Sequence, residues 1–254
     1  MFKILGLLRG VAALILVATF TVPAMAQAQG PAKTVVLVHG AFADGSSWAK
    51  VIPLLKKAGL KVIAVQNPLD SLEHDVAFTN RALDLAEGPV VLVGHSWGGV
   101  VITEAGLHEK VKSLVYVASY APDVGQSLVD TVKGYPEAPG QAFFVKDAKG
   151  FFRISDEGVF KHFAADLTPA EQEVVAATQG AFSSTAVVTP VTKAAWKKVP
   201  TFVVVSGNDT INPPQMQRDQ VKKLDARSVE VASSHVVMLS HPDVVAKMIL
   251  EAAR

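Results

Sequence analysis

Short runs of β-branched and other apolar residues recur along the chain and constrain its fold more than any other feature. Six such runs lie at residues 34–39, 61–65, 89–94, 113–119, 201–207 and 228–232. Because most of these runs are continuously apolar, we expect strands that are buried on both faces, as in a parallel sheet. Helix-like segments separate them at residues 47–58, 72–86, 97–108, 213–224 and 241–253. The alternation predicts an α/β fold with a mostly parallel six-stranded sheet flanked by helices.

One interval between the expected strands is too long for a single crossover helix. About eighty residues separate the fourth run from the fifth, whereas a connection of roughly a dozen residues suffices. We therefore expect a small, mainly helical cap inserted after the fourth strand, at about residues 121–198. Helix start signals lie at Asp156 and in the sequence LTPAEQ, residues 167–172. Seven of the chain's twelve phenylalanines fall in this insert, where they can form its own core or line a pocket.

The first residues of the chain have the layout of a secretory signal peptide. Two basic residues precede an apolar run at residues 11–20, and small residues lead up to Ala26. This order predicts a signal peptide at residues 1–26 and export to the periplasm or medium of a bacterium. A membrane anchor is the alternative, but Pro23 and two glutamines interrupt the apolar stretch. The remainder, residues 27–254, has the length of one α/β domain, although two domains are possible.

The charge balance and the lack of cysteine exclude several classes of function. Cleavage after residue 26 removes two of the 24 basic residues and none of the 23 acidic ones, so the formal net charge changes from +1 to −1. A chain so close to neutral has no electrostatic field for holding nucleic acid or an anionic membrane. Because the sequence has no cysteine, thiolate nucleophiles, disulfides and zinc–thiolate sites are excluded.

A serine stands between glycines where the third apolar run ends, in VVLVGHSWGGVV, residues 90–101. Gly94 and Gly98 allow a sharp strand-to-helix turn that raises the Ser96 hydroxyl above the carboxyl edge of the sheet. The helix that begins at Trp97 directs its free N–H groups and positive dipole end at the same point. This pattern favours a nucleophilic serine beside an anion site. The alternative is a structural turn in which Ser96 only caps the helix.

At this motif the sequence resembles the α/β-hydrolase superfamily, and the resemblance extends over most of the chain after residue 26. VVLVHGAF is similar to the His-Gly oxyanion loop of that superfamily, VGHSWGG to its nucleophile elbow, VVVSGNDTINP to its acid loop and VASSHVVMLSHPD to its histidine loop. The order Ser, Asp, His along the chain also matches. The resemblance implies the α/β-hydrolase fold and a catalytic triad.

A serine nucleophile needs a histidine base, and seven histidines compete for this role. His235 follows the last expected strand, at the sheet edge where active groups gather, and we assign it as the base. His241, at the start of the closing helix, is the alternative. The other five are interpreted as structural or surface residues: His39, His74, His95, His108 and His162.

The histidine in turn needs an acid, and Asp209 leaves a strand end in VVVSGNDTINP. Asp123, which follows the fourth run, is the second choice because it also comes after a strand. Asp219 and Asp225 belong to the following helix or to its end, where a solvated carboxylate is the usual interpretation.

The oxyanion of the reaction needs backbone donors. We expect one from Trp97, directly after the nucleophile, and the other from Ala41, with Phe42 as alternate. The expected substrate pocket comprises Phe42, Trp97, Tyr120, Phe152, Phe163 and Val236.

The endings SGND and SSHVVMLSHP resemble a branch with plant methyl esterases, hydroxynitrile lyases and uncharacterised bacterial hydrolases. The lyases of that branch carry a threonine at the position of Gly40 and a lysine at the position of Val236. Both departures favour hydrolysis of a small apolar or aryl ester through an acyl-enzyme, without a metal or organic cofactor. Hydroxynitrile lyase, perhydrolase or haloperoxidase activity and a non-catalytic module that binds an apolar ligand are the alternatives. The oligomeric state has no signature in the sequence.

Overall fold

A computed structural model describes residues 30–254, so the expected signal peptide at residues 1–26 lies outside the described residues. Six strands form one sheet in the order β2-β1-β3-β4-β8-β9, and every neighbouring pair is parallel. They are β1 (Thr34–Val38), β2 (Lys61–Ala64), β3 (Val90–His95), β4 (Val111–Val117), β8 (Thr201–Ser206) and β9 (Arg227–Val231). All residues of β1 and β3 are buried, as continuous apolarity predicts for central strands. The predicted six-stranded sheet is confirmed.

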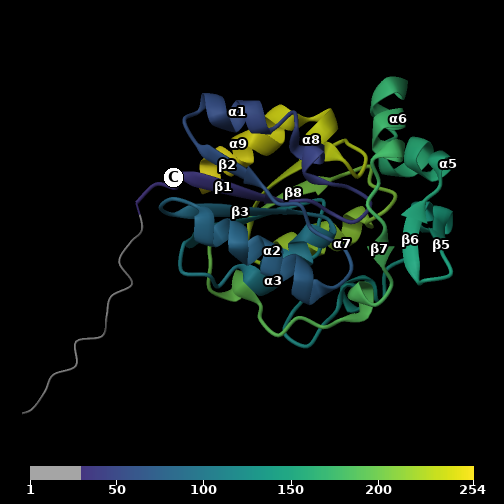
Figure 1. Ribbon diagram of the computed structural model, residues 1–254, viewed down its shortest axis with the longest axis horizontal. Helices are drawn as coiled ribbons and strands as arrows, with labels where there is room; N and C mark the ends of the chain where they lie inside the picture. The colour runs from purple at the N-terminus through teal and green to yellow at the C-terminus, as the bar shows by residue number, and fades with distance from the viewer. Residues whose placement is uncertain (1–29) are drawn as a thin grey trace, which may run out of the picture.

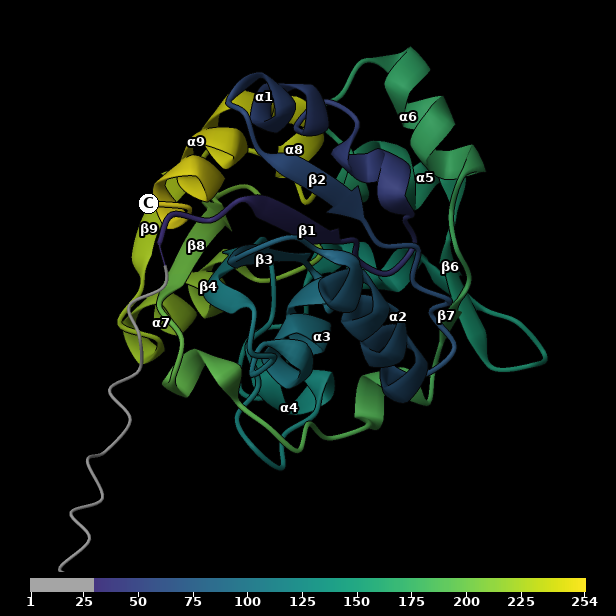
Figure 2. The same ribbon diagram turned by 60° about the vertical axis from the view of Figure 1, so that its left-hand side comes forward.

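Helices cover both faces of this sheet (Figures 1 and 2). One face carries α1 (Ile52–Lys57) and α9 (Pro242–Ala252), and the other carries α2 (Leu72–Leu85), α3 (Trp97–Ala105) and α7 (Pro214–Lys223). The residues of α3 are buried except Glu104, because the sheet and neighbouring segments enclose the helix. Between the last strand and α9, a short helix α8 (Val237–Ser240) follows the loop that contains His235.

The helix expected at residues 47–58 is instead two separate pieces. A 3-10 helix, η1 (Gly45–Trp48), comes first, and α1 begins afresh at Ile52. Asp44 caps η1 by accepting a hydrogen bond from the Ser46 N–H (2.7 Å). Pro53 lies in the first turn of α1, where its missing N–H and fixed φ suit a helix start rather than a helix interior. The proline therefore explains the break.

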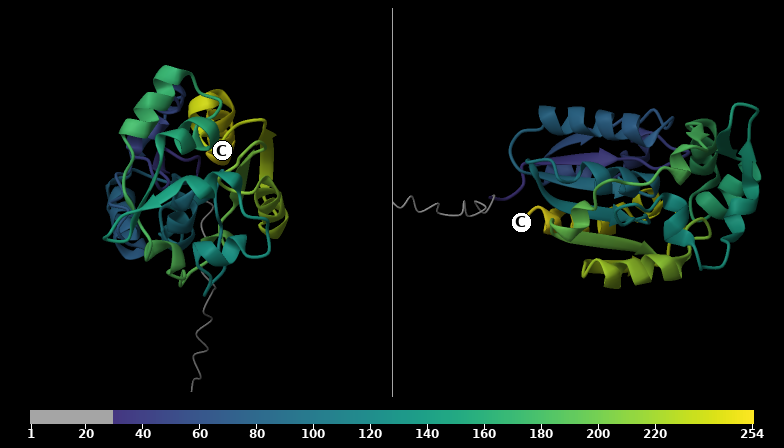
Figure 3. Two further views of the ribbon diagram at one scale, coloured as in Figure 1. Left: turned by 90° about the vertical axis from the view of Figure 1, so that its right-hand side faces the viewer. Right: turned by 90° about the horizontal axis from the view of Figure 1, so that it is seen from below.

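The chain between β4 and β8 forms the segment that we call the cap. Most of it lies over the carboxyl ends of the strands, whereas its last turn, at residues 195–197, packs against α3 (Figures 1 and 3). Its elements are α4 (Leu128–Val132), η2 (Pro139–Phe143), β5 (Phe144–Lys146), β6 (Phe151–Ile154), α5 (Asp156–Gly158), the π-helical turn η3 (Val159–Phe163), α6 (Pro169–Ala177), β7 (Phe182–Ser183), η4 (Ala186–Val188) and η5 (Ala195–Lys197). Both expected helix starts occur, and at α6 the Glu171 carboxylate accepts hydrogen bonds from the Thr168 N–H and hydroxyl. The antiparallel sheet β5-β6-β7 is an addition to the expected helical cap.

The strand order reverses between β1 and β3, since the chain moves from β1 outward to β2 and then returns to the far side of β1. In open parallel sheets, ligands bind at the carboxyl edge near such a switch point. The cap lies over this edge, so a site there is enclosed between the cap and the sheet (Figure 3). Within residues 30–254, no helix combines the length and the apolar character needed to cross a bilayer.

Candidate active site

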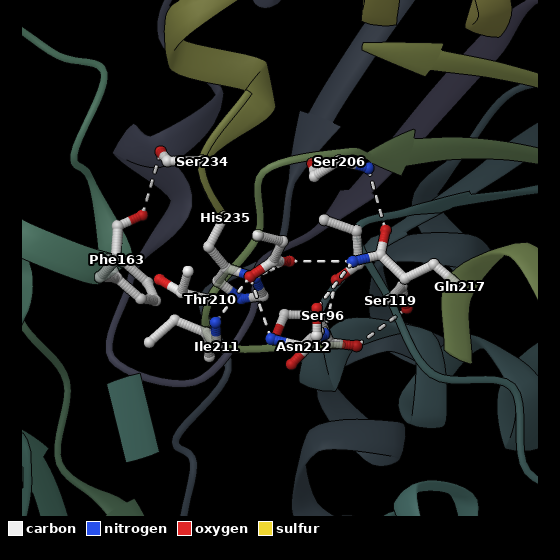
Figure 4. Close-up of polar contacts among 12 residues, drawn as sticks. Ser96, Ser119, Phe163, Ser206, Thr210, Ile211, Asn212, Gln217, Ser234 and His235 are labelled. Carbon is white, nitrogen blue, oxygen red and sulfur yellow. Dashed lines mark hydrogen bonds and ion pairs between the residues drawn. The ribbon is translucent and has the colours of Figure 1, made fainter. Parts of the chain in front are cut away.

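Ser96 occupies the sharp turn between β3 and α3, with φ of +50° and ψ of −119°. A side chain at Gly94 would place its Cβ 2.4 Å from the Gly98 carbonyl oxygen, and one at Gly98 would place it 2.5 Å from the Val38 oxygen. Both positions therefore require glycine. A non-glycine residue at positive φ costs about 1–3 kcal/mol and persists only where its surroundings hold it. The Ser119 hydroxyl and the Gly99 N–H both donate to the Ser96 carbonyl, each at 2.9 Å (Figure 4).

The Ser96 side chain makes no capping hydrogen bond to α3. The structural alternative, in which this serine exists to cap the helix, is therefore wrong. The side chain lines a pocket under the cap instead.

Asp209 and His235 form a buried pair after β8 and β9. The two atoms His235 Nδ1 and Asp209 Oδ2 are 2.7 Å apart, and both side chains are at most 1% exposed. Asp209 Oδ1 accepts from the N–H groups of Ile211 (2.8 Å) and Asn212 (2.9 Å), and Oδ2 accepts from Gln217 Nε2 (2.9 Å). Figure 4 shows these neighbours beside His235. The surrounding donors hold the carboxylate in one orientation toward the imidazole.

The opposite ring nitrogen, His235 Nε2, is buried and has no hydrogen-bond partner among the described residues. In the tautomer whose Nδ1–H donates to Asp209, the lone pair is on Nε2. His235 and Ser96 line the same pocket. The loops thus bring a serine hydroxyl and a basic nitrogen with a free lone pair to one cavity.

Two backbone amides near Ser96 are also free. In residues 30–254, the N–H groups of Ala41 and Trp97 have no hydrogen-bond partner, and both residues line the pocket. Trp97 is the first residue of α3, where N–H groups lack partners within the helix. Phe42, the alternate donor, has a φ of +58° and contributes its ring to the pocket. The arrangement is suited to binding a negatively charged oxygen.

The pocket has a volume of about 260 Å³ and is mostly apolar. Five of the six expected residues line it, namely Phe42, Trp97, Tyr120, Phe152 and Phe163. Val236 lies outside it, because the loop directs His235 into this pocket and its neighbour into an adjacent cavity. Sequence reasoning did not place the other lining residues, among them Leu128, Val129 and Val132 of α4, Gln141, Phe144, Phe182, Val187 and Ile211.

The cap phenylalanines divide between the two roles that the sequence left open. Phe144, Phe152, Phe163 and Phe182 line the pocket. Phe143 instead packs against His162 within the cap, with a distance of 4.8 Å between the two ring centroids. His162 is therefore not a plain surface histidine; it is half-buried, and its Nδ1 is 3.0 Å from the Thr210 hydroxyl.

The competing acids and bases lie in other surroundings. Asp123 is paired with Lys197 at 2.5 Å, and that hydrogen bond holds the pKa of the carboxyl below its usual value. Asp219 pairs with Lys222 on the exposed side of α7 (3.0 Å). His241 contacts the hydroxyl of Ser240 (3.0 Å). None of these side chains lines the pocket.

His39 and His95 have the structural roles expected for them. His39 Nδ1 donates to the Gly40 carbonyl (2.8 Å), and its Nε2 accepts from the Asn67 N–H (2.9 Å). His95 Nε2 lies 3.0 Å from the carbonyl oxygen of His235. Burial holds the pKa of both rings below the ordinary value of 6.5, so they are neutral. His74 lies at the surface, as expected, and pairs with Asp70 (3.0 Å). His108 pairs with Asp84 (3.1 Å), but its side chain is only 17% exposed, so it is half-buried rather than the expected surface residue. Among residues 30–254, no group of three or more acidic or histidine side chains is placed to hold a metal.

Comparison with known proteins agrees with this architecture. A family model described as the alpha/beta hydrolase family matches residues 35–248. The chain belongs to the α/β-hydrolase family. The α/β-hydrolase fold that the sequence predicts is therefore confirmed, over almost the whole part of the chain that the structure describes.

The similar proteins include examples from bacteria and from plants. A pyrethroid hydrolase of Sphingobium wenxiniae is 26% identical over 249 residues, covering 86% of this α/β-hydrolase and 87% of that protein. Salicylic acid-binding protein 2 of Nicotiana tabacum is 35% identical over 106 residues, 36% of this chain and 41% of that protein. The crystal structure of polyneuridine aldehyde esterase has a TM-score of 0.78 at 20% identity and covers 88% and 100% of the two chains. The expected resemblance to the plant branch and to bacterial hydrolases is confirmed.

A buried carboxylate that the sequence did not single out supports the elbow of this α/β-hydrolase. Asp75 in α2 is fully buried, and its Oδ2 accepts a hydrogen bond from the Trp97 indole Nε1 (2.6 Å). Its Oδ1 accepts from the N–H of Leu69 (2.9 Å), a residue with a φ of +62°. Asp75 thereby joins α2, the loop before it and the first residue of α3.

Burial makes Asp75 a source of pH-dependent stability. It raises the pKa of this carboxyl from 3.8 to about 6. Between these values the folded state keeps a proton that the unfolded state has lost, so stability falls as the pH rises from about 4 to about 6. The loss reaches on the order of 3 kcal/mol. Urea unfolding of the wild type and of Asp75→Asn across this range should show the loss in the wild type only.

Glu73→Gln, an exposed change on the same turn of α2, is the control and should retain the wild-type pH dependence. Equal pH dependence of the free energy of unfolding in Asp75→Asn and the wild type would contradict this role for Asp75.

Proposed function

We propose that this α/β-hydrolase cleaves small apolar or aryl carboxylic esters through a triad of Ser96, His235 and Asp209. The observation that carries the proposal is the buried His235–Asp209 hydrogen bond of 2.7 Å, which leaves Nε2 free in the pocket that Ser96 lines. Relatives named as a pyrethroid hydrolase and a polyneuridine aldehyde esterase support hydrolysis of an ester bond.

In the proposed reaction, Ser96 Oγ attacks the ester carbonyl carbon while His235 Nε2 takes the hydroxyl proton. The carbonyl oxygen becomes an oxyanion, which the N–H groups of Ala41 and Trp97 bind. His235 then gives its proton to the leaving alkoxide, and the alcohol departs. A water molecule, deprotonated by His235, attacks the acyl-enzyme; the bond from Ser96 Oγ to the acyl carbon breaks, His235 returns the proton to Oγ, and the carboxylic acid is released. Asp209 keeps the imidazole in the required tautomer and stabilises the imidazolium.

The lining of the pocket favours binding of an uncharged, apolar acyl group. Aromatic and aliphatic side chains from the sheet edge and from the cap surround Ser96. Its polar groups besides the triad members are few: the hydroxyl of Tyr120 donates to Asn212 Oδ1, and Gln141 reaches the Ile211 carbonyl (3.4 Å). A lining of this type favours apolar groups over ionic ones.

Cyanohydrin cleavage fits the site less well than ester hydrolysis does. A Cβ at Gly40 would lie 2.8 Å from Ser96 Cβ, so the threonine that resemblance assigns to lyases does not fit this backbone. Val236, at the position of the lyase lysine, is buried and faces an apolar cavity. The site therefore has no cation there to hold a leaving cyanide.

The direct test is reaction with a fluorophosphonate probe, followed by intact mass and peptide mapping. We expect a single adduct on Ser96, because only a serine activated by its base attacks such probes readily. Absence of an adduct, together with tight binding of a small aryl compound, would favour a non-catalytic binding module. Peracid formation faster than hydrolysis would favour a perhydrolase. The mass of unlabelled protein from an expressing bacterium also tests the proposed signal peptide, since cleavage after Ala26 leaves Gln27 as the first residue.

A further inference from the structure

A second apolar cavity lies beside the pocket that contains Ser96. Its volume is about 450 Å³. The cap contributes Leu167, Val174 and Val175 to its walls, and the core contributes Ala49, Val236 and Leu239. The cavity therefore lies where α6 faces η1 and α8, on the side of the cap away from α4.

Two phenylalanine rings separate this cavity from the pocket. Phe42 and Phe163 line both spaces. Their ring centroids are 6.4 Å apart at an interplanar angle of 82°, an edge-to-face contact. The Phe163 ring also lies 5.1 Å from the His235 ring (Figure 4). One layer of side chains thus stands between the second cavity and the reacting groups.

The second cavity favours an uncharged apolar occupant. Three charged side chains line its rim, and two of them, Lys50 and Glu171, form an ion pair of 2.5 Å across the gap between core and cap. The Asp44 carboxylate is engaged by the Ser46 N–H. Val174 is 58% exposed at the rim. An apolar group placed here would remove this side chain from water without stranding a charge.

The cavity lies on the leaving-group side of the proposed reaction. His235 delivers its proton to the departing alkoxide, so the alcohol arm must lie near Nε2. Phe163 packs on the His235 ring, and Val236, the next residue, lines the second cavity. The acyl arm is expected to occupy the first pocket, which is lined by Trp97 and by residues of α4. The alcohol arm is therefore directed toward the second cavity.

We propose that the second cavity binds the alcohol arm of an ester that has bulky apolar groups on both sides of its ester bond. The inference rests on the proposed function. The first pocket, at about 260 Å³, is smaller than sites that enclose drug-sized ligands, which occupy roughly 300–1,000 Å³. The two spaces together lie within that range. Displacement of the Phe42 and Phe163 rings joins them into one site for a two-armed substrate.

The test compares two isomeric esters in the wild type and in variants whose second cavity is filled by a tryptophan side chain. In 2-naphthylmethyl acetate the naphthyl group is on the alcohol, and in methyl 2-naphthylacetate it is on the acyl group. Ala170→Trp fills the cavity from the cap, and Ala49→Trp fills it from the core. Both changes should lower kcat/KM for the first ester at least tenfold relative to the second. Ala177→Trp, an exposed change on the same helix α6 that lines neither cavity, is the matched control and should keep the wild-type ratio.

A binding measurement separates this inference from the proposed function. Calorimetry should show that the Ser96→Ala protein binds 2-naphthylmethanol, and that adding Ala170→Trp weakens binding at least tenfold. If this binding result is obtained but the wild type hydrolyses neither ester, the proposed function is refuted and the assignment of the cavity still holds. Unchanged binding and an unchanged ester ratio in both filled variants would overturn the cavity assignment. A selective loss of the acyl-side ester would overturn it as well, since the cavity would then hold the acyl arm.

Discussion

Replacement of Ser96 by alanine should lower kcat for ester hydrolysis by about 10⁶-fold, because a triad acts as a unit and loses its function with any essential member. A residual rate above that of water should remain, since the Ala41 and Trp97 amides and the pocket are unchanged. The measurement is turnover of an apolar aryl acetate by wild-type and variant protein, each purified from a host without contaminating esterase. KM should change far less than kcat.

The control for this change is Ser228→Ala, an exposed serine in β9 far from the pocket, which should keep wild-type turnover. Thermal unfolding of the Ser96→Ala protein should resemble that of the wild type, because no side-chain hydrogen bond of Ser96 is removed. Hydrolysis within tenfold of the wild-type rate in a folded Ser96→Ala protein would mean that another group is the nucleophile.

Replacement of Asp209 by asparagine should lower kcat about 10⁴-fold. Asparagine retains Oδ1, which can still accept from the N–H groups of Ile211 and Asn212, so the loop should remain folded. Its amide N–H₂ would take the place of Oδ2, which accepts from His235 Nδ1 at 2.7 Å. The imidazole then favours the tautomer with its proton on Nε2, and the base is lost. Turnover of the same aryl acetate, together with thermal unfolding, measures the effect.

Asp123→Asn is the matched control, since Asp123 also follows a strand but pairs with Lys197 at the surface. An exposed ion pair contributes only about 0–1 kcal/mol to stability, and turnover should stay near the wild-type rate. The opposite outcome, a large loss in Asp123→Asn and little loss in Asp209→Asn, would reverse the choice of acid.

The sheet could be predicted because its central strands are buried on both faces and therefore continuously apolar. The small sheet of the cap could not be predicted from the sequence. The three strands β5, β6 and β7 are only two to four residues long. Most residues of β5 and β6 are partly or fully exposed. Strands of this length depend on their cross-strand pairs, such as Phe152 with Phe182, which are distant in sequence. By contrast, the start of α6 depends on Thr168 and Glu171, a local signal that the sequence displays.

The residues of the candidate site also differ in whether the sequence alone reveals them. Ser96, Asp209 and His235 could be proposed from sequence because each follows a strand, and parallel strands end at one edge of a sheet. Asp75 has no such signal. In sequence it is an acidic residue in the first turn of α2, where a solvated carboxylate near a helix N-terminus is ordinary. Only the docking of α3 and of the loop at Leu69 against α2 buries it.

The sequence by itself determined the α/β class, the positions of the six strands of the main sheet and the residues proposed for the triad, since these depend on local periodicity, glycine placement and strand ends. The tertiary structure alone decided which cap phenylalanines face the pocket, that Val236 faces away from it and that Phe42 and Phe163 divide two cavities. The physical reason is that side chains brought together from the core and the cap create these spaces, and their contacts join residues that no local pattern relates.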